Sequence, residues 1–283
     1  MLDTTLIKFR NVLYRDFSDN EIFDLTRILN GLGILIYYIT VIIPNFGKFF
    51  LSDGFVSPEA FTFYPKSWLF YFHDSQMILV LLFAVSFLML MAYTLGFYAK
   101  WALIILLPIH LGFHAANPFI LHEPQQLSNL LLILTLFLPI ENHWALKKRR
   151  DMFPELKIRE SRLILQSLLV YLSLYYFFAG IKKIPDPFWI KGSAVSDILN
   201  WPYLGRDNFL VNIIKNPAIS KVLTYMTLVF EMSFVFIAFT RFRRGLLFLG
   251  FFFHLFIALT MDVGLFFWAM MSWYPVLLIK PRR

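Results

Sequence analysis

The stretch YYFFAGIKKIPDPFWIKGSA, residues 175–194, decides the fold class, because an aromatic apolar run ends abruptly at two lysines and a proline-rich turn. Apolar runs of this kind recur from residue 25 to 280, with no polar block long enough to fold alone. Hydrophobic residues make up 59% of the 283-residue chain and charged residues only 16%, which excludes an ordinary soluble domain. The composition therefore indicates an integral membrane protein with a single membrane domain.

Apolar stretches near the roughly 20 residues that cross hydrocarbon predict about eight transmembrane helices. They are residues 25–46, 75–98, 101–120, 126–141, 162–181, 221–240, 245–262 and 264–280. The fourth and the last two are short, which leaves open a re-entrant or strongly tilted segment. The predicted fold class is all-α: a polytopic, integral membrane bundle.

The segments outside these spans are predicted to lie at the membrane interface. Residues 1–24 set basic side chains against apolar ones, as an amphipathic interfacial helix does, and residues 25–283 form the transmembrane domain. Two long segments, 47–74 and 182–220, are rich in the aromatic residues that favour the headgroup region. We therefore expect short interfacial helices or lids that roof the bundle on its outer face.

Basic residues predict the sidedness, because short loops rich in Lys and Arg stay in the cytoplasm. With the N-terminus inside, the basic residues of the even-numbered turns and of the tail fall on the same side: Lys100, residues 147–150, residues 241–244 and residues 280–283. The sequence thus predicts a multi-pass protein of the cell membrane with both termini cytoplasmic. This topology and attraction to anionic membrane lipid account for the net charge of +8, so no nucleic-acid partner is expected.

Several ionisable residues fall within the spans, where a charge costs about 2.5–3.5 kcal/mol on insertion scales and needs a partner, a cavity or a route to the interface. They are Arg27, His110, His114, Glu231, His254 and Asp262. Arg27, near the cytoplasmic end of its span, either extends to the interface or pairs with Glu231. For Glu231, near the middle of its span, a structural hydrogen bond and a catalytic proton role are both open.

His110 and His114 are four residues apart and share one helix face, a spacing that suits a metal ion. No Asp or Glu at matching helical spacing completes a ligand set, so we expect a polar seam between helices and no metal site. The absence of cysteine excludes thiolate metal sites and disulfides.

Lys182 and Lys183 follow directly on the fifth predicted span. A lysine at a helix end commonly extends to the headgroups. Ala179 and Gly180, however, allow another backbone to approach closely, and the prolines that follow stiffen the turn, so the amines are also free to point inward. A desolvated amine binds its proton less tightly and can act as a general base.

Four stretches together carry a family resemblance. They are residues 23–35 (FDLTRILNGLGIL), 138–150 (LPIENHWALKKRR), 175–194 and 251–270 (FFFHLFIALTMDVGLFFWAM). They resemble the membrane domain of vitamin K-dependent gamma-carboxylase, also called the HTTM (horizontally transferred transmembrane) domain. The resemblance covers essentially the whole chain and implies the same helical membrane fold.

The resemblance also implies a chemistry. In the carboxylases the lysine that corresponds to Lys183 is the base toward a reduced vitamin K-type quinone, so the implied catalytic set is Lys183 and Lys182 with His122, Glu123 and His254. Where the carboxylases carry an Asn-His pair, this chain has Glu123-Pro124, with His122 displaced by two positions.

The carboxylases also carry a large lumenal domain that holds the substrate protein, whereas this chain ends at Arg283. It resembles compact bacterial members of the family, some of which mature secreted toxins together with a small partner subunit.

Two functions follow as competing hypotheses. The first is a quinol-dependent enzyme, a gamma-glutamyl carboxylase-like lyase, that modifies a secreted peptide with Lys183 as general base. The second is a non-catalytic membrane subunit for maturation or export of a secreted peptide or toxin. A transporter is disfavoured, because neither inverted repeats nor paired broken helices are evident. The enzyme requires Lys183, His122, Glu123 and His254 to converge on one apolar cavity large enough for a quinone ring.

Overall fold

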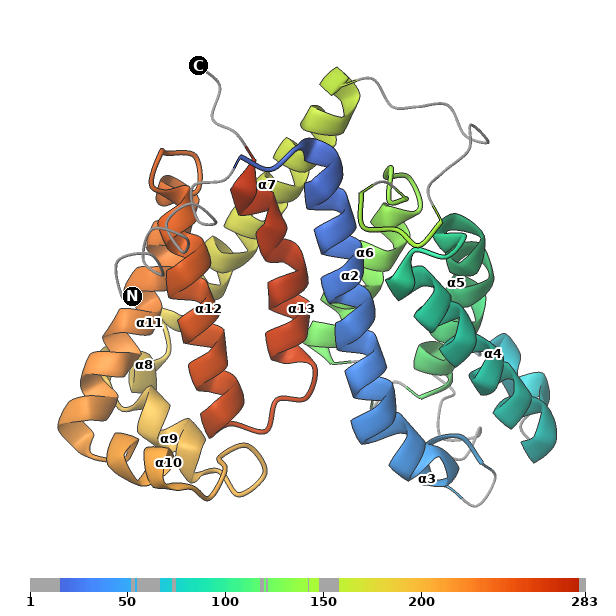
Figure 1. Cartoon of the computed structure of the whole chain (residues 1–283). Coiled ribbons are helices and arrows are strands. Elements are labelled where there is room, and N and C mark those ends of the chain that lie inside the picture. Colours follow the sequence, from blue (N-terminus) through green and yellow to red (C-terminus); the bar gives the residue numbers. More distant parts are fainter. Residues whose placement is uncertain are drawn as a thin grey trace, which may run out of the picture.

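The computed structural model describes residues 16–51, 54, 67–72, 75–117, 120, 122–141, 143–147 and 158–279. These residues form helices joined by turns, with one isolated bridge between Gly205 and Met261. The longer helices run up and down along a common direction (Figure 1). In chain order the α-helices are α2 (Asp19–Tyr37), α3 (Phe46–Phe50), α4 (Gln76–Leu95), α5 (Ala99–Ala116), α6 (Glu123–Thr135), α7 (Ile158–Lys183), α8 (Pro187–Lys191), α9 (Ala194–Asn200), α10 (Phe209–Ile214), α11 (Pro217–Ile237), α12 (Arg243–Thr260) and α13 (Phe266–Trp273).

Six helical segments are long and apolar enough to cross a membrane: Asp19–Phe50, Gln76–Leu95, Ala99–Ala116, Arg162–Lys183, Pro217–Ile237 and Arg243–Thr260. The fourth and eighth predicted spans are also helical. However, α6 has 13 residues and Phe266–Leu278 is likewise a shorter apolar helix. At 1.5 Å per residue, α6 covers about 20 Å of a hydrocarbon layer about 30 Å thick. The predicted count of eight spans is therefore not confirmed.

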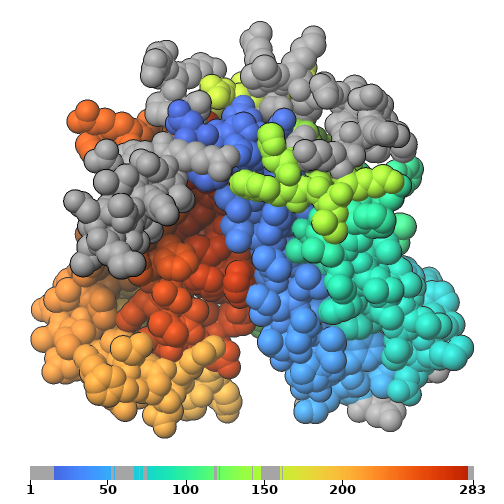
Figure 2. Space-filling model, in the orientation of Figure 1, coloured from blue at the N-terminus to red at the C-terminus, as the bar shows by residue number. Residues whose placement is uncertain are grey.

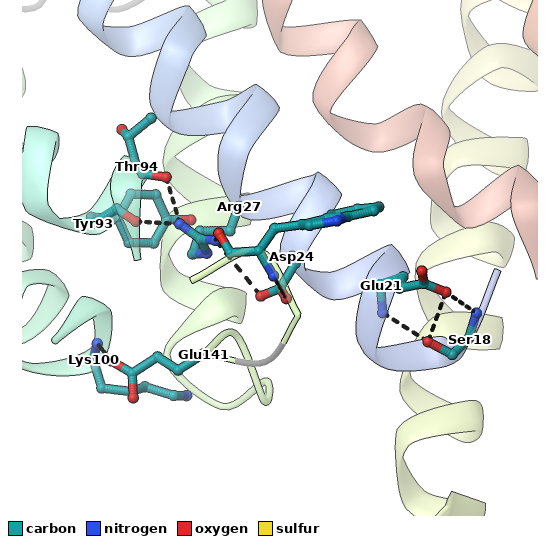
Figure 3. A network of polar contacts seen from close by, with 9 residues as sticks. Ser18, Glu21, Asp24, Arg27, Tyr93, Thr94, Lys100 and Glu141 are labelled. Atoms are coloured by element: carbon teal, nitrogen blue, oxygen red, sulfur yellow. Dashed lines mark hydrogen bonds and ion pairs between the residues drawn. The ribbon is translucent and has the colours of Figure 1, made fainter. Parts of the chain in front are cut away.

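The first span begins at Ser18, because this residue and Glu21 form a capping box. Ser18 Oγ accepts from the Glu21 N–H at 3.2 Å, and the Glu21 carboxylate accepts from the Ser18 N–H at 2.9 Å (Figure 3). Helix α2 thus starts six residues before the boundary predicted at residue 25. The predicted interfacial helix remains a prediction for residues 1–15, which lie outside the described residues.

Helix α2 continues into a π-helical turn, Tyr38–Ile42, and a 3-10 turn, Ile43–Asn45, before α3. Pro44 explains this irregularity, because its ring nitrogen cannot donate to the preceding turn. π-helical turns are frequent at functional sites, and here the turn brings Tyr38 to the interior.

Helix α2 is the centre of the packing and lies beside α13 and α4 (Figure 1). Glycines make this possible, because a Cβ at Gly31 would lie 2.1 Å from Thr94 Oγ1 of α4, and one at Gly33 would lie 2.6 Å from Trp268 Cβ of α13. On the other side of α13, α7 packs along α11.

Residues 182–220, predicted as an outer interfacial segment, contain the short helices α8, α9 and α10; their position at the outer membrane interface stays a prediction. They lie with α3 at the lower end of the bundle in Figure 1. Most of the segment 47–74 lies outside the described residues.

Candidate functional site

A cavity of about 850 Å³ opens at the end of the bundle where α3, α9 and α10 lie. Figure 2 shows the molecule hollowed there, between the gold and red segments and the blue ones. Most lining side chains are apolar or aromatic and come from α2, α3 and α6 to α13, except α10. Its ionisable lining residues are His122, Glu123, Lys183, Glu231, His254 and Asp262.

Lys183 and Glu231 form an ion pair on the cavity wall. The Lys183 Nζ donates to both carboxylate oxygens of Glu231. The Glu231 side chain is 8% exposed and that of Lys183 is 25% exposed. The Lys183 amine also lies 5.0 Å from the centre of the Trp189 ring, which adds a cation–π contact. The lysine is thus held inward by an anion and an aromatic face.

Local sequence explains why the two side chains meet. A Cβ at Gly180 would lie 2.8 Å from Met232 Cγ and 3.3 Å from Glu231 Cβ, so the glycine lets α7 and α11 approach closely. Asp186 then caps α8, its carboxylate accepting from the Phe188 N–H at 2.9 Å, and fixes the turn after Lys183. The close approach predicted at Gly180 is confirmed.

His254 is held by two tyrosines. Tyr176 Oη lies 2.5 Å from His254 Nε2 and 2.5 Å from Tyr274 Oη. Tyr274 reaches this position because Gly250 leaves space, since a Cβ there would lie 2.0 Å from the Tyr274 Oη. Both His254 and Tyr176 line the cavity and are almost fully buried. The His254 Nδ1 has no hydrogen-bond partner among the described residues.

The chain of hydrogen bonds can run in two directions. If Tyr274 donates to Tyr176 and Tyr176 donates to His254 Nε2, the neutral imidazole carries its proton on Nδ1, which is then a donor without an acceptor. In the opposite direction His254 donates from Nε2, and Nδ1 is an acceptor without a donor. In both cases His254 Nδ1 lacks a partner among the described residues, and an unpaired buried polar group costs about 1–3 kcal/mol.

Three further ionisable residues lie at the solvent-exposed mouth of the cavity. His122 precedes α6 and Glu123 begins it, and both side chains are exposed. Glu123 lies close enough to Glu231 for an electrostatic interaction. Asp262 follows α12 and forms an exposed ion pair with Arg206 at 3.8 Å. The mouth thus carries more carboxylates than the interior.

Comparison of the sequence with known protein families identifies the family of this chain. The family profile described as HTTM domain matches residues 14–280, nearly the whole chain. The chain belongs to the HTTM domain family. No curated protein and no solved structure matches it significantly. The membership and the six apolar helices make it a multi-pass membrane protein.

In this HTTM protein, the cavity gathers most of the residues that the sequence singled out. Lys183, His122, Glu123 and His254 all line it, as does Glu231. Lys182 does not line it and is exposed.

Sequence reasoning missed Tyr176 and Tyr274, which hold His254. Two signals were present in the sequence. Tyr176 belongs to the motif at 175–194, and Gly250 precedes His254 by one helical turn.

His110 and His114 lie away from the cavity, in the polar seam that the sequence predicted. His110 Nδ1 lies 2.6 Å from Tyr38 Oη, and its Nε2 lies 2.8 Å from Asn129 Oδ1. The Asn129 amide nitrogen donates to His114 Nδ1 at 2.8 Å, and Tyr38 Oη lies 3.0 Å from Ser86 Oγ. Among the described residues no group of three or more His, Asp or Glu side chains could hold a metal ion. The seam joins α2, α4, α5 and α6 through hydrogen bonds.

Arg27 is a structural residue of the opposite end (Figure 3). It is fully buried and donates to the carbonyls of Tyr93 at 2.8 Å, Thr94 and Trp144 at 3.0 Å. Its guanidinium also lies 3.7 Å from Asp24, whose carboxylate accepts from the Trp144 N–H at 3.1 Å. The expected alternatives, extension to the interface or pairing with Glu231, are both wrong. Carbonyls at the end of α4 and in the loop after α6 accept hydrogen bonds from the two Nη atoms of Arg27 instead.

Proposed function

We propose that this HTTM protein is a quinol-dependent membrane enzyme that modifies a secreted peptide, with Lys183 as the proton-accepting group. The observation that carries the proposal is the convergence of Lys183, Glu231 and His254 on one apolar cavity. An ion pair and an unpaired histidine nitrogen are costly in such surroundings. Groups of this kind in an apolar cavity are typical of sites that bind and react.

The cavity fits a reduced vitamin K-type quinone. Its volume of about 850 Å³ lies within the range of small-molecule sites, roughly 300–1,000 Å³. Phe49, Phe253 and Trp189 supply aromatic walls for a flat ring. The His254 Nδ1 has no hydrogen-bond partner among the described residues, and a quinol hydroxyl, which can both donate and accept, would supply one. When bound, a reduced quinone would provide reducing equivalents and a strong base for proton abstraction from the peptide.

The residues of the chain would then have distinct tasks. Lys183 donates to both carboxylate oxygens of Glu231, and this pair would take up the proton of a bound quinol hydroxyl, with Lys183 as the proposed base. His254 would pair through Nδ1 with a ligand hydroxyl, and Tyr176 holds its ring. The walls exclude water from the proton transfer. This assignment gives the chemistry of a gamma-glutamyl carboxylase-like lyase.

We further propose the orientation and the partners. Arg162 lies near the start of α7 and Arg243 in the first turn of α12, and these helix starts lie at the end opposite the cavity (Figure 1), so that end would be cytoplasmic in the cell membrane, with both termini there. The cavity would then open outward, where a secreted peptide arrives. A small partner subunit would deliver that peptide to the carboxylates of the mouth.

The alternative is a non-catalytic membrane subunit for maturation or export. Such a subunit needs no ligand cavity and no ionisable residues converging within the bundle. We place it second because the cavity supports an enzyme.

Binding of a quinol tests the proposal. Protein in lipid nanodiscs is titrated with a reduced naphthoquinone by calorimetry, with wild type, Lys183→Met and the matched control Lys182→Met. Because Lys182 is exposed and does not line the cavity, the control should bind as wild type does, whereas Lys183→Met should bind at least about tenfold more weakly. No saturable binding to wild type would contradict the proposal and favour the non-catalytic subunit.

A further inference from the structure

Arginines gather at the end of the bundle opposite the cavity. Arg162 lies near the start of α7, and Arg243 and Arg244 form the first turn of α12. Arg162 Nη2 pairs with Asp19 at 3.5 Å, and Arg244 Nη2 pairs with Asp16 at 3.2 Å. The outer two arginines therefore have carboxylate partners.

Arg243 stands between them without such a partner. Its guanidinium is close enough to Arg162 and Arg244 for electrostatic repulsion, which places it inside the cluster. The residue is 7% exposed, and its Nη2 has no hydrogen-bond partner among the described residues. No carboxylate pairs with it in that part of the chain. A buried guanidinium surrounded by like charges is unfavourable unless an anion compensates it.

The N-terminus of α12 adds to the positive electrostatic potential around Arg243. The N-cap of α12 is Phe242, which offers no side-chain hydrogen bond to the first turn. The N–H groups of Arg243 and Gly245 donate to the carbonyls of Thr240 and Phe242, so the contribution of this helix end is its dipole, which favours an anion beside Arg243.

We propose that the cluster of Arg162, Arg243 and Arg244 binds one anionic phosphate group, either the phosphodiester of an anionic phospholipid or free phosphate. Guanidinium forks match phosphate oxygens in pairs, and basic pockets between transmembrane helices suit anionic headgroups. The site is independent of the quinol cavity.

The test compares two neighbouring arginines. Arg241 is exposed, lies 4.9 Å from the Phe242 ring and is outside the cluster, so Arg241→Gln removes the same charge from the same turn as Arg243→Gln. Each protein in neutral detergent is titrated with phosphatidylglycerol, phosphatidylcholine or sodium phosphate at constant ionic strength, and its thermal unfolding midpoint is recorded.

We expect a saturable rise of the midpoint with phosphatidylglycerol but not with zwitterionic phosphatidylcholine. Arg243→Gln should weaken the apparent affinity at least about tenfold, the effect of losing a charge-assisted hydrogen bond, and Arg241→Gln should not. A rise with phosphatidylglycerol alone assigns the site to a lipid headgroup, and an equal rise with sodium phosphate assigns it to the free anion.

The unfolding midpoint of each variant with ligand is compared with the midpoint of the same variant without ligand. A variant that is less stable is therefore not mistaken for one that has lost binding. If Arg243→Gln does not fold, Arg162→Gln tests the same site from α7. The proposal is overturned if neither anion gives a saturable rise, or if the cluster variants respond as Arg241→Gln does.

Discussion

Substituting Lys183 and substituting Glu231 should destabilise the protein by different amounts, although each substitution breaks the same ion pair. The Glu231 side chain is 8% exposed and that of Lys183 is 25% exposed. Lys183→Met leaves a carboxylate in an apolar wall, whereas Glu231→Gln leaves an ammonium that can turn toward water and still donate to the amide oxygen.

The magnitudes follow from burial. Breaking a fully buried ion pair costs about 3–5 kcal/mol, and the partial exposure of Lys183 reduces the expectation for Lys183→Met to about 2–3 kcal/mol. Glu231→Gln should cost about 1 kcal/mol, the net value of a typical hydrogen bond. Replacing both, as Lys183→Met with Glu231→Gln, should recover about 2 kcal/mol relative to the sum, because no charge remains buried.

Reversible unfolding in mixed micelles, followed by tryptophan fluorescence, measures these free energies. Lys182→Met is the matched control and should stay within about 0.5 kcal/mol of wild type. Additivity of the two changes within about 0.5 kcal/mol, or a larger loss in Glu231→Gln than in Lys183→Met, would refute the reasoning.

Three other substitutions test the remaining interactions. Gly250→Ala places a Cβ 2.0 Å from Tyr274 Oη and should destabilise the protein by about 1–3 kcal/mol through lost packing and hydrogen bonding, measured by thermal unfolding; an unchanged midpoint would contradict the contact. Arg27→Ala leaves Asp24 without its cation and three carbonyls without their donor. It should cost about 3–5 kcal/mol, seen as loss of folded protein in membranes; normal yield and stability would exclude this role. His110→Phe breaks the seam at its centre and should lower stability by about 1–3 kcal/mol while quinol affinity stays within twofold; a larger affinity loss would connect the seam to the cavity.

Apolar run length located every long helix, because hydrophobic length is set by the membrane itself. Apolar run length did not predict the ends of the helices accurately. The boundary at residue 25 missed the capping box of Ser18 and Glu21, although the Ser-x-x-Glu pattern was visible in the sequence. It also overestimated α6 at its C-terminal end, since residues 136–140 carry apolar side chains but lie beyond the last helical residue, Thr135.

The sequence identified the ionisable residues that line the cavity, but it did not show which of them pair with each other. Lys183, His122, Glu123 and His254 were expected to converge, and all line the cavity. The pairing of Glu231 with Lys183 was not expected, because a single sequence does not show which helices pack against each other. Arg27 was a candidate on grounds of depth alone, whereas its contacts come from residues 66 to 117 positions away.

Labelling of the cavity by a photoreactive naphthoquinone tests the central claim most directly. The probe is illuminated with protein in nanodiscs, and labelled peptides are identified by mass spectrometry. Labels on the α7 segment that contains Tyr176 and Lys183, competed by excess reduced naphthoquinone, are the predicted result. Labels confined to exposed, lipid-facing residues such as Phe236 and Leu249, without competition, would contradict it.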